Sequence, residues 1–254
     1  MPLKFKSFGS GDPVIILHGL FGTLDNWQTM AKRLAEDFTV FIIDQRNHGK
    51  SPHLDEISYP LMAEDLRKFM EDHWIYEAHI VGHSMGGKTA MQFAMDYPDM
   101  VNKLVVVDIA PKAYVGNHQL IFEALFEVPL NTLESRSEAA AVLKKKMGDD
   151  PGTIQFLLKN LTRDKEGGYS WKMNLPVLFK DYDKILAAVK GEEIFDKATL
   201  FIKGGASDYI LHNDLEEIRT LFPKAKLEEV AGSGHWVHAQ APEKLYRLLV
   251  DFLK

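Results

Sequence analysis

The chain has 254 residues, of which 46% are hydrophobic and 26% charged, a composition typical of a globular protein with a full core. Its net charge is -6 and it has no basic block to neutralise phosphates, so nucleic acid is not an expected partner. The absence of cysteine excludes thiol nucleophiles, cysteine-rich metal sites and disulfides, and is compatible with a reducing cytoplasm.

No targeting or membrane segment is predicted. Residues 1–13 contain Lys, Pro and Gly but no apolar run of signal-peptide length. No segment approaches the roughly 18 consecutive apolar residues of a membrane span. We therefore expect a cytoplasmic protein, and the sequence leaves its oligomeric state open.

Short apolar or β-branched runs predict strands along the chain. Five are continuously apolar, which is typical of strands covered on both faces: 14–17, 39–43, 78–81, 104–107 and 199–202. Residues 4–8 and 226–230 instead alternate polar with apolar residues, as strands at sheet margins do. Helical spacing occurs between strands, for example at Ala90, Phe93, Ala94 and Tyr97 before Pro98. This alternation predicts an α/β fold with a mostly parallel, twisted sheet flanked by helices.

The alternation breaks between Pro111 and about Lys190. Four runs in this stretch have helical spacing, and none is a convincing strand: 120–126, 138–147, 153–161 and 177–189. Because strand patterns flank the stretch on both sides, we interpret it as an inserted helical cap and not as an independent helical domain. The predicted division is a core over 1–110, a helical cap over 111–190 and the rest of the core over 191–254.

A Gly-x-Ser-x-Gly motif follows the strand predicted at 78–81. Residues 82–87 read Gly-His-Ser-Met-Gly-Gly and lead into a helix, which is the context of a nucleophile elbow. The glycines permit a tight turn that exposes the Ser84 hydroxyl, and the helix N-terminus supplies positive potential. Ser84 is therefore the candidate nucleophile.

A serine hydroxyl needs a base within hydrogen-bond reach. Of the ten histidines, His235 is the best placed, because it lies on the loop after the 226–230 strand and before the final helix. This loop belongs to the carboxyl edge of the sheet, as the elbow does. His238, three residues further on, is the nearest alternative base but is not the one we assign. His83 is interpreted as shaping the turn.

The loop after the 14–17 strand supplies a candidate oxyanion hole. It reads His-Gly-Leu-Phe-Gly at 18–22, and we assign the main-chain N–H groups of Leu20 and Met85 as the donor pair. Candidate side chains of the substrate pocket are Phe21, His83, Phe122 and Trp236. For an apolar residue of a helical insert such as Phe122, core packing is the default interpretation.

These motifs resemble the α/β-hydrolase superfamily over essentially the whole chain. The resemblance rests on residues 18–22, 44–51 and 82–87, and three further segments narrow it: 87–89, 108–111 and 232–238. Together they are similar to bacterial esterases of the YbfF type, which are related to the mitochondrial abhydrolase-domain-containing protein 11. The resemblance implies an α/β-hydrolase fold and hydrolysis of carboxylic esters or acyl thioesters. We interpret Asp44, Arg46 and His48 as structural residues of a loop beside the elbow.

The acid that orients His235 is left open between two aspartates. In the superfamily it usually follows the strand that is here 199–202, but Ser207 stands at the usual position and Asp208 comes one residue late. Some superfamily members take the acid from the end of the strand after the elbow helix, which here is Asp108. We favour Asp108 over Asp208, with Ser207 able to add a hydrogen bond.

The predicted reaction is hydrolysis of a small-molecule ester through an acyl-enzyme on Ser84, with His235 as general base and without a metal or organic cofactor. Haloalkane dehalogenases and epoxide hydrolases of this fold need an aspartate nucleophile, so Ser84 argues against both. Two alternatives remain open: a cofactor-free perhydrolase with the same triad, and a non-catalytic ligand receptor on a hydrolase scaffold.

Overall fold

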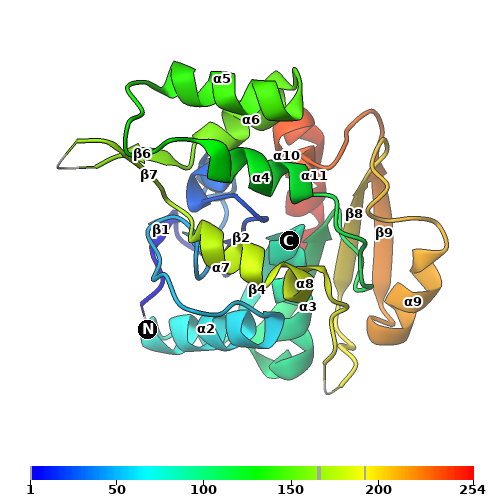
Figure 1. Cartoon of the computed structure of the whole chain (residues 1–254). Helices are drawn as coiled ribbons and strands as arrows, with labels where there is room; N and C mark the ends of the chain where they lie inside the picture. The colour runs from blue at the N-terminus through cyan, green and yellow to red at the C-terminus, as the bar shows by residue number, and fades with distance from the viewer. Residues whose placement is uncertain (1, 165–166, 192) are drawn as a thin grey trace.

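A seven-stranded sheet runs through the computed structural model of the chain (Figure 1), in the order β1-β3-β2-β4-β5-β8-β9. The strands are β1 (Phe5–Phe8), β2 (Pro13–Leu17), β3 (Thr39–Ile43), β4 (Ala78–His83), β5 (Val101–Val107), β8 (Thr199–Gly204) and β9 (Ala225–Val230). Only the edge strand β1 pairs antiparallel, with β3, and the other pairs of this sheet are parallel. The structure describes residues 2–164, 167–191 and 193–254; residue 1, residues 165–166 and residue 192, which fall within the three predicted segments, lie outside the described residues.

The sheet confirms the predicted strand set and its margins. Every residue of the central strand β4 is buried, because both faces of the sheet are covered. The two alternating segments are the edge strands β1 and β9, most of whose residues are partly buried or exposed. Neighbouring residues face opposite sides: Ile80 packs in one apolar cluster and Val81 in another.

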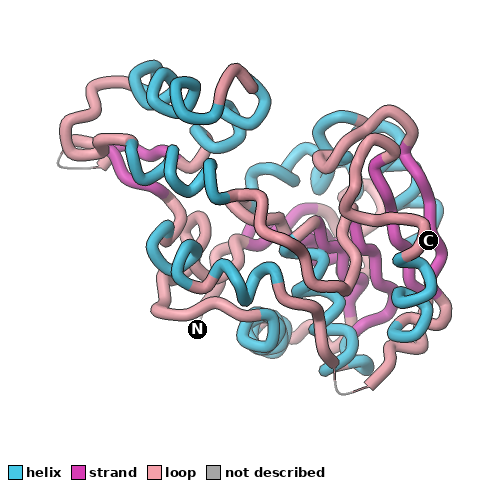
Figure 2. The backbone as a smooth tube through the Cα atoms, turned by 45° about the vertical axis from the view of Figure 1, so that its right-hand side comes forward, coloured by secondary structure: helices cyan, strands magenta, loops and turns pink. Residues whose placement is uncertain are grey.

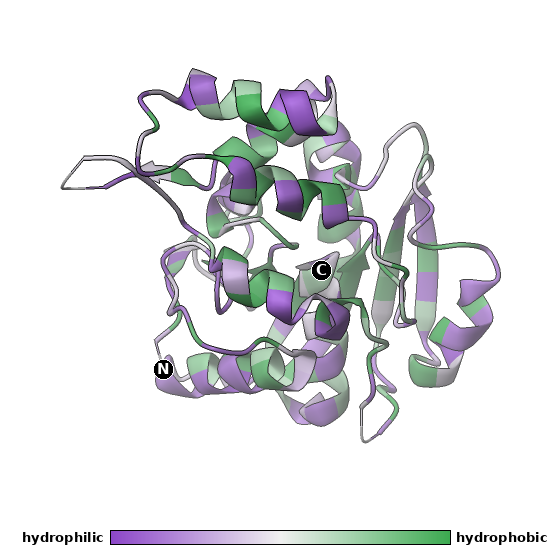
Figure 3. Ribbon diagram, in the orientation of Figure 1, coloured by the Kyte–Doolittle hydropathy of each residue, from purple (hydrophilic) through white to green (hydrophobic). Residues whose placement is uncertain are grey.

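Helices cover both faces of the sheet. Helices α2 (Tyr59–Asp72), α3 (Met85–Asp96) and α9 (Asp214–Leu221) contribute to the cluster that contains Ile80. Helices α1 (Gln28–Leu34) and α11 (Pro242–Leu253) contribute to the cluster on the opposite face. Short helices η1 (Leu24–Trp27), η2 (Pro98–Met100) and α10 (Val237–Gln240) complete these regions. Surface helices such as α2 mix hydrophilic and hydrophobic residues along their length (Figure 3), as amphipathic packing requires.

The chain between β5 and β8 forms a separate layer above the carboxyl edge of the sheet (Figures 1 and 2). We call it the inserted segment. It contains α4 (Gln119–Glu127), α5 (Arg136–Met147), α6 (Pro151–Leu158), β6 (Leu161–Arg163), β7 (Tyr169–Trp171), α7 (Leu175–Lys180) and α8 (Tyr182–Leu186). Its apolar cluster includes Phe21, Tyr59 and Met85 from the sheet-bearing part, so the segment packs directly over the nucleophile turn.

The prediction that this stretch contains no strand is wrong. Strands β6 and β7 pair antiparallel as a small hairpin, with Leu161 opposite Trp171, and the predicted helix over 153–161 ends at Leu158. The helix predicted over 177–189 is two short helices, α7 and α8. Three-residue strands are too short to display a period of two, so the helical spacing of the flanking residues concealed them.

Candidate active site

The turn between β4 and α3 holds Ser84 in an uncommon backbone conformation, with φ 53° and ψ -120°. The flanking glycines make this turn possible because they let backbone segments approach each other closely. A Cβ atom on Gly82 would lie 2.2 Å from the Gly86 carbonyl oxygen, and one on Gly86 would lie 2.4 Å from the Leu17 carbonyl oxygen. The turn therefore needs glycine at both positions, and it raises Ser84 above the sheet edge.

A continuous chain of hydrogen bonds joins Ser84, His235 and Asp108. The Ser84 hydroxyl lies 2.9 Å from Nε2 of His235, and Nδ1 of His235 lies 2.8 Å from Oδ2 of Asp108. Because Asp108 is an acceptor, we assign the ring proton to Nδ1, which leaves Nε2 free to accept from Ser84. The three residues follow the ends of β4, β9 and β5, which parallel pairing gathers at one edge of the sheet.

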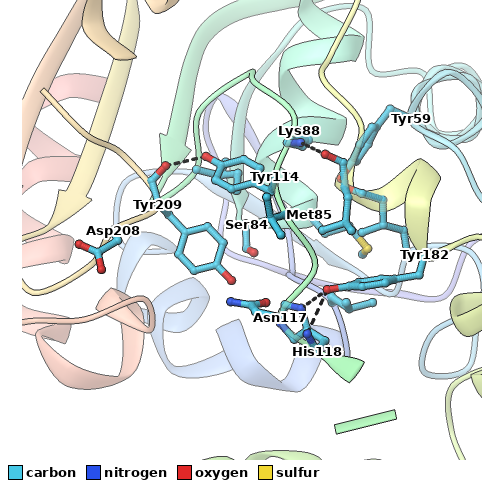
Figure 4. A pocket seen from close by; sticks show the side chains of 15 residues that line it. Tyr59, Ser84, Met85, Lys88, Tyr114, Asn117, His118, Tyr182, Asp208 and Tyr209 are labelled. Atoms are coloured by element: carbon cyan, nitrogen blue, oxygen red, sulfur yellow. Dashed lines mark hydrogen bonds between the residues drawn. The ribbon is translucent and has the colours of Figure 1, made fainter. Parts of the chain in front are cut away.

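Asp108 is fully buried, and its carboxylate has three donors. The Gly204 N–H donates to Oδ1 at 2.8 Å, and the Ser207 hydroxyl donates to Oδ2, which also accepts from His235. Asp208 is exposed, and its carboxylate points away from Ser84 (Figure 4). Of the two acids that the sequence left open, the structure thus brings Asp108 to His235, with Ser207 beside it.

Leu20 and Met85 line the same cavity as Ser84. Met85 is the first residue of α3, where backbone N–H groups lack intrahelical acceptors and the helix dipole is positive. The loop that carries Leu20 packs tightly on the elbow, since a Cβ atom on Gly19 would lie 3.2 Å from that of Ser84. This arrangement is suited to an anion that develops at Ser84.

Three further histidines pack around the triad residues. Burial lowers the pKa of His83 well below its usual value, and Nε2 of this ring donates to the His235 carbonyl oxygen at 2.8 Å. Burial also lowers the pKa of His18 to about 4, and this ring lies between the Gly19 carbonyl and the Gln45 N–H. His238 stacks on the Trp27 ring, with centroids 4.8 Å apart, and so packs beside the site.

Two cavities meet at Ser84. One is lined by aromatic residues of the inserted segment, of α2 and of the loop after β8, among them Tyr59, Tyr114, Tyr182 and Tyr209 (Figure 4). The other contains His235 and the predicted pocket residues Phe21, His83 and Trp236. Leu20, Ser84 and His118 line both cavities. A group held on Ser84 can therefore extend in two directions.

The chain matches the family model described as the alpha/beta hydrolase fold over residues 12–242. It belongs to the α/β-hydrolase family. It is 38% identical to Esterase YbfF of Escherichia coli over 245 residues, which cover 96% of this chain and 94% of that protein. It is also 38% identical over 247 residues to the mouse sn-1-specific diacylglycerol lipase ABHD11, with 94% of this chain and 80% of that protein covered. Among solved structures, a marine microorganism esterase superposes with a TM-score of 0.96 at 42% identity, covering 98% of both chains. The resemblance to YbfF-type esterases is confirmed.

The hydrolase cavities include residues that sequence reasoning missed. His118, Asn117 and the four tyrosines come from segments far apart in the chain, and no local motif marks them. The hydroxyl groups of three tyrosines bond within the protein: Tyr59 donates to the Ile185 carbonyl, Tyr114 donates to the Tyr209 carbonyl, and Tyr182 pairs with the His118 ring. These three hydroxyl groups are consequently held by protein partners at the cavity wall. The Tyr209 ring also stacks on His235, with centroids 3.9 Å apart.

The structure corrects the prediction for Phe122, which lines neither of the two cavities. Its side chain is fully buried and packs edge-on against Phe21, with ring centroids 5.1 Å apart, and against Phe179 and Tyr182. The ring is needed in the apolar cluster of the inserted segment, behind Phe21. Core packing, the default for an apolar side chain here, is its role in the hydrolase.

The side chains of Asp44, Arg46 and His48 hold their own loop in place through hydrogen bonds and an ion pair. The Asp44 carboxylate accepts from the Leu24 and Lys50 N–H groups at 2.8 and 2.9 Å. Arg46 forms a buried ion pair with Asp65 at 2.6 Å, and Nδ1 of His48 donates to the Arg46 carbonyl. These contacts agree with the structural interpretation of the loop.

Within residues 2–164, 167–191 and 193–254, no three His, Asp or Glu side chains are arranged to hold a metal ion. Over the same residues, no helix is long and apolar enough to cross a bilayer.

Proposed function

We propose that this chain is a serine carboxylesterase that hydrolyses small-molecule esters or thioesters through an acyl-enzyme on Ser84. The observation that carries the proposal is the hydrogen-bond chain from Ser84 through His235 to the buried Asp108, located where two cavities meet. The names of the relatives, an esterase and a diacylglycerol lipase, agree with ester chemistry.

In the proposed mechanism, Oγ of Ser84 attacks the ester carbonyl carbon while Nε2 of His235 takes the hydroxyl proton. The N–H groups of Leu20 and Met85 donate to the oxyanion, and Asp108 stabilises the imidazolium without accepting its proton. Collapse of the tetrahedral intermediate breaks the bond to the leaving oxygen, which receives the proton from His235. Water then releases the acyl group by the same route.

In this mechanism the two cavities bind different parts of the substrate. His235 must protonate the leaving oxygen, and it lines only one of the two cavities. We therefore assign that cavity to the leaving alcohol or thiol. The tyrosine-lined cavity, which Met85 also lines, is assigned to the acyl group. We further propose a cytoplasmic location, which rests on the cysteine-free sequence.

The test is hydrolysis of p-nitrophenyl esters together with labelling by a fluorophosphonate. Ser84→Ala should lose about 10³-fold or more of the activity and all labelling, because no covalent bond can form. Ser233→Ala is the matched control, since its hydroxyl is buried in the His235 loop and donates to the Val230 carbonyl. A folded wild-type protein that binds esters without turnover or labelling would instead be a ligand receptor, and the proposal would be wrong.

A further inference from the structure

Lys88 is a buried lysine that the proposed mechanism does not use. It lies one turn after Ser84 in α3, and its backbone N–H donates to the Ser84 carbonyl at 3.1 Å. The residue is 1% exposed, although lysine is almost never fully buried unless its charge is paired. An interior ammonium group needs hydrogen-bond acceptors to offset its desolvation.

The acceptors of Lys88 are backbone carbonyls from both ends of the inserted segment. Its Nζ lies 2.8 Å from the Lys112 oxygen, 2.6 Å from the Ala187 oxygen and 3.2 Å from the Leu186 oxygen. Lys112 precedes α4, whereas Leu186 is the last residue of α8 and Ala187 follows it. The three donors of the ammonium group therefore match three acceptors on two separate passes of the chain.

These two passes are bonded to each other, and we call residues 111–114 and 186–189 the neck. The Tyr114 N–H donates to the Leu186 carbonyl at 2.9 Å, and the Val189 N–H donates to the Pro111 carbonyl at 2.7 Å. Lys88 lies beneath the neck and binds carbonyls of both passes. In Figure 4 its side chain extends from α3 between Tyr59 and Tyr114.

Aromatic rings enclose the ammonium group. Its nitrogen lies 4.7 Å from the centroid of Tyr114 and 5.6 Å from that of Tyr59. Burial lowers the pKa of Lys88 to about 7, whereas the ring faces and the three carbonyl dipoles favour its charged form. Tyr59 also holds the trailing pass, through its bond to the Ile185 carbonyl at 2.5 Å.

The neck and the residues next to it form one wall of the tyrosine-lined cavity. Tyr114 and Val115 come from the leading pass, Ile185 and Leu186 from the trailing one, and Lys88 lines the same cavity. The distance between α3 and the neck consequently determines how far this wall stands from Ser84.

We propose that Lys88 is a positioning residue that binds both ends of the inserted segment to the helix of the nucleophile and thereby sets the shape of the acyl cavity. The assignment of this cavity to the acyl group rests on the proposed function; the neck contacts do not. Lys88 touches no reacting atom in this account, so its loss should change substrate selection more than the chemical step.

The test compares Lys88→Met with Gln92→Met. Gln92 lies one turn further along α3. Its amide bonds to Asp96 in the same helix and, of the two ends of the inserted segment, to the trailing one, through the Lys190 carbonyl at 2.8 Å. For Lys88→Met, we expect kcat/KM for p-nitrophenyl hexanoate to fall by about tenfold or more, mainly through KM, and that for the acetate to stay within about threefold. Deuterium exchange at residues 112–118 and 182–189 should become faster. Gln92→Met should leave the hexanoate-to-acetate ratio within about twofold of the wild type.

Chemical rescue separates the ammonium group from the size of the side chain. The chain has no cysteine, so Lys88→Cys carries a single thiol that can be alkylated in denaturant before refolding. Bromoethylamine restores a lysine-like ammonium, whereas bromoethane gives a shorter apolar side chain with no charge. We expect the wild-type ratio and exchange rates only with the aminoethyl group. Lys88→Gln, which keeps two N–H donors, is the milder variant if Lys88→Met does not fold, and it should change the ratio in the same direction.

An unchanged hexanoate-to-acetate ratio and unchanged exchange in Lys88→Met and Lys88→Gln would overturn the proposal, and so would equal losses for both esters. If the wild type hydrolyses neither ester, the proposed function fails. Exchange at the neck then still tests the role of Lys88.

Discussion

Two residues of the candidate site, Ser84 and Asp108, have a positive φ of 53° without being glycine. Each residue directly follows a strand, and its backbone N–H forms one more hydrogen bond to the neighbouring parallel strand. Ser84 N–H donates to the Val107 carbonyl of β5, and Asp108 N–H donates to the Ile202 carbonyl of β8. These bonds hold a backbone conformation that is costly by itself. A positive φ held by a bond to the neighbouring strand therefore orients both the serine and the aspartate towards His235, from the ends of β4 and β5.

At this scale the structure predicts unequal roles for the two aspartates. Asp108→Asn should cost about 10³- to 10⁴-fold in kcat, because an amide at this position favours the wrong tautomer of His235. Asp208→Asn is the matched control and should stay within about threefold, since its carboxylate is exposed and points away. Steady-state kinetics on a p-nitrophenyl ester measures both. A larger loss for Asp208→Asn would assign the orienting role to Asp208.

At the scale of elements, the junction of β4 and α3 requires glycine, which has no side chain. Gly86 lies against the Leu17 and His18 carbonyls, so the first turn of α3 contacts the end of β2 directly. Helix α3, whose residues are all buried except Asp96, then runs from Ser84 to the inserted segment. This close approach of helix and strand also brings Met85 and Leu20 to the same cavity.

Gly86→Ala should consequently destabilise the protein by about 3 kcal/mol or more, because a Cβ atom would lie 2.4 Å from the Leu17 oxygen and the elbow would have to move. Gly152→Ala is the control in α6. Its nearest neighbour would be an Asp150 oxygen at 3.4 Å, and it should be neutral or stabilising by up to about 1 kcal/mol. Urea denaturation gives both free energies. Wild-type stability of Gly86→Ala would show that the elbow tolerates a side chain.

At the scale of the whole molecule, folding buries neutral histidines beneath the layer of the inserted segment. Burial lowers the pKa of His18 to about 4 and that of His48 to about 3. The two rings lie 5.1 Å apart and are both buried. In the unfolded chain they take protons near pH 6.5, so below this pH the unfolded state binds more protons than the folded one.

Stability should therefore be complete above pH 6.5 and fall as the pH decreases towards 4, with each of these histidines contributing a loss of about 2 kcal/mol at pH 5. His48→Gln removes one titrating ring and keeps a donor for the Arg46 carbonyl. The difference in unfolding free energy between pH 7 and pH 5 should shrink by about 2 kcal/mol in this variant. An unchanged pH dependence in urea denaturation would mean that His48 is protonated in the folded state.

Local patterns in the sequence determined the strands of the seven-stranded sheet and the two central residues of the site. Continuous apolar runs predict β2 to β5 and β8, and the Gly-x-Ser-x-Gly turn predicts the position of Ser84. His235 could be predicted because chain order places its loop at the same sheet edge. Such features depend on a few adjacent residues, which a sequence displays directly.

Only the tertiary structure decided which aspartate reaches His235, which rings line the tyrosine-lined cavity and what Lys88 binds. Asp108 and Asp208 both follow strands, and the choice depends on how the loop after β8 lies against β5. Lys88 meets its acceptors 24, 98 and 99 residues away. Contacts of this kind form between segments that only the packed sheet and the inserted segment bring together, so no local periodicity or motif encodes them.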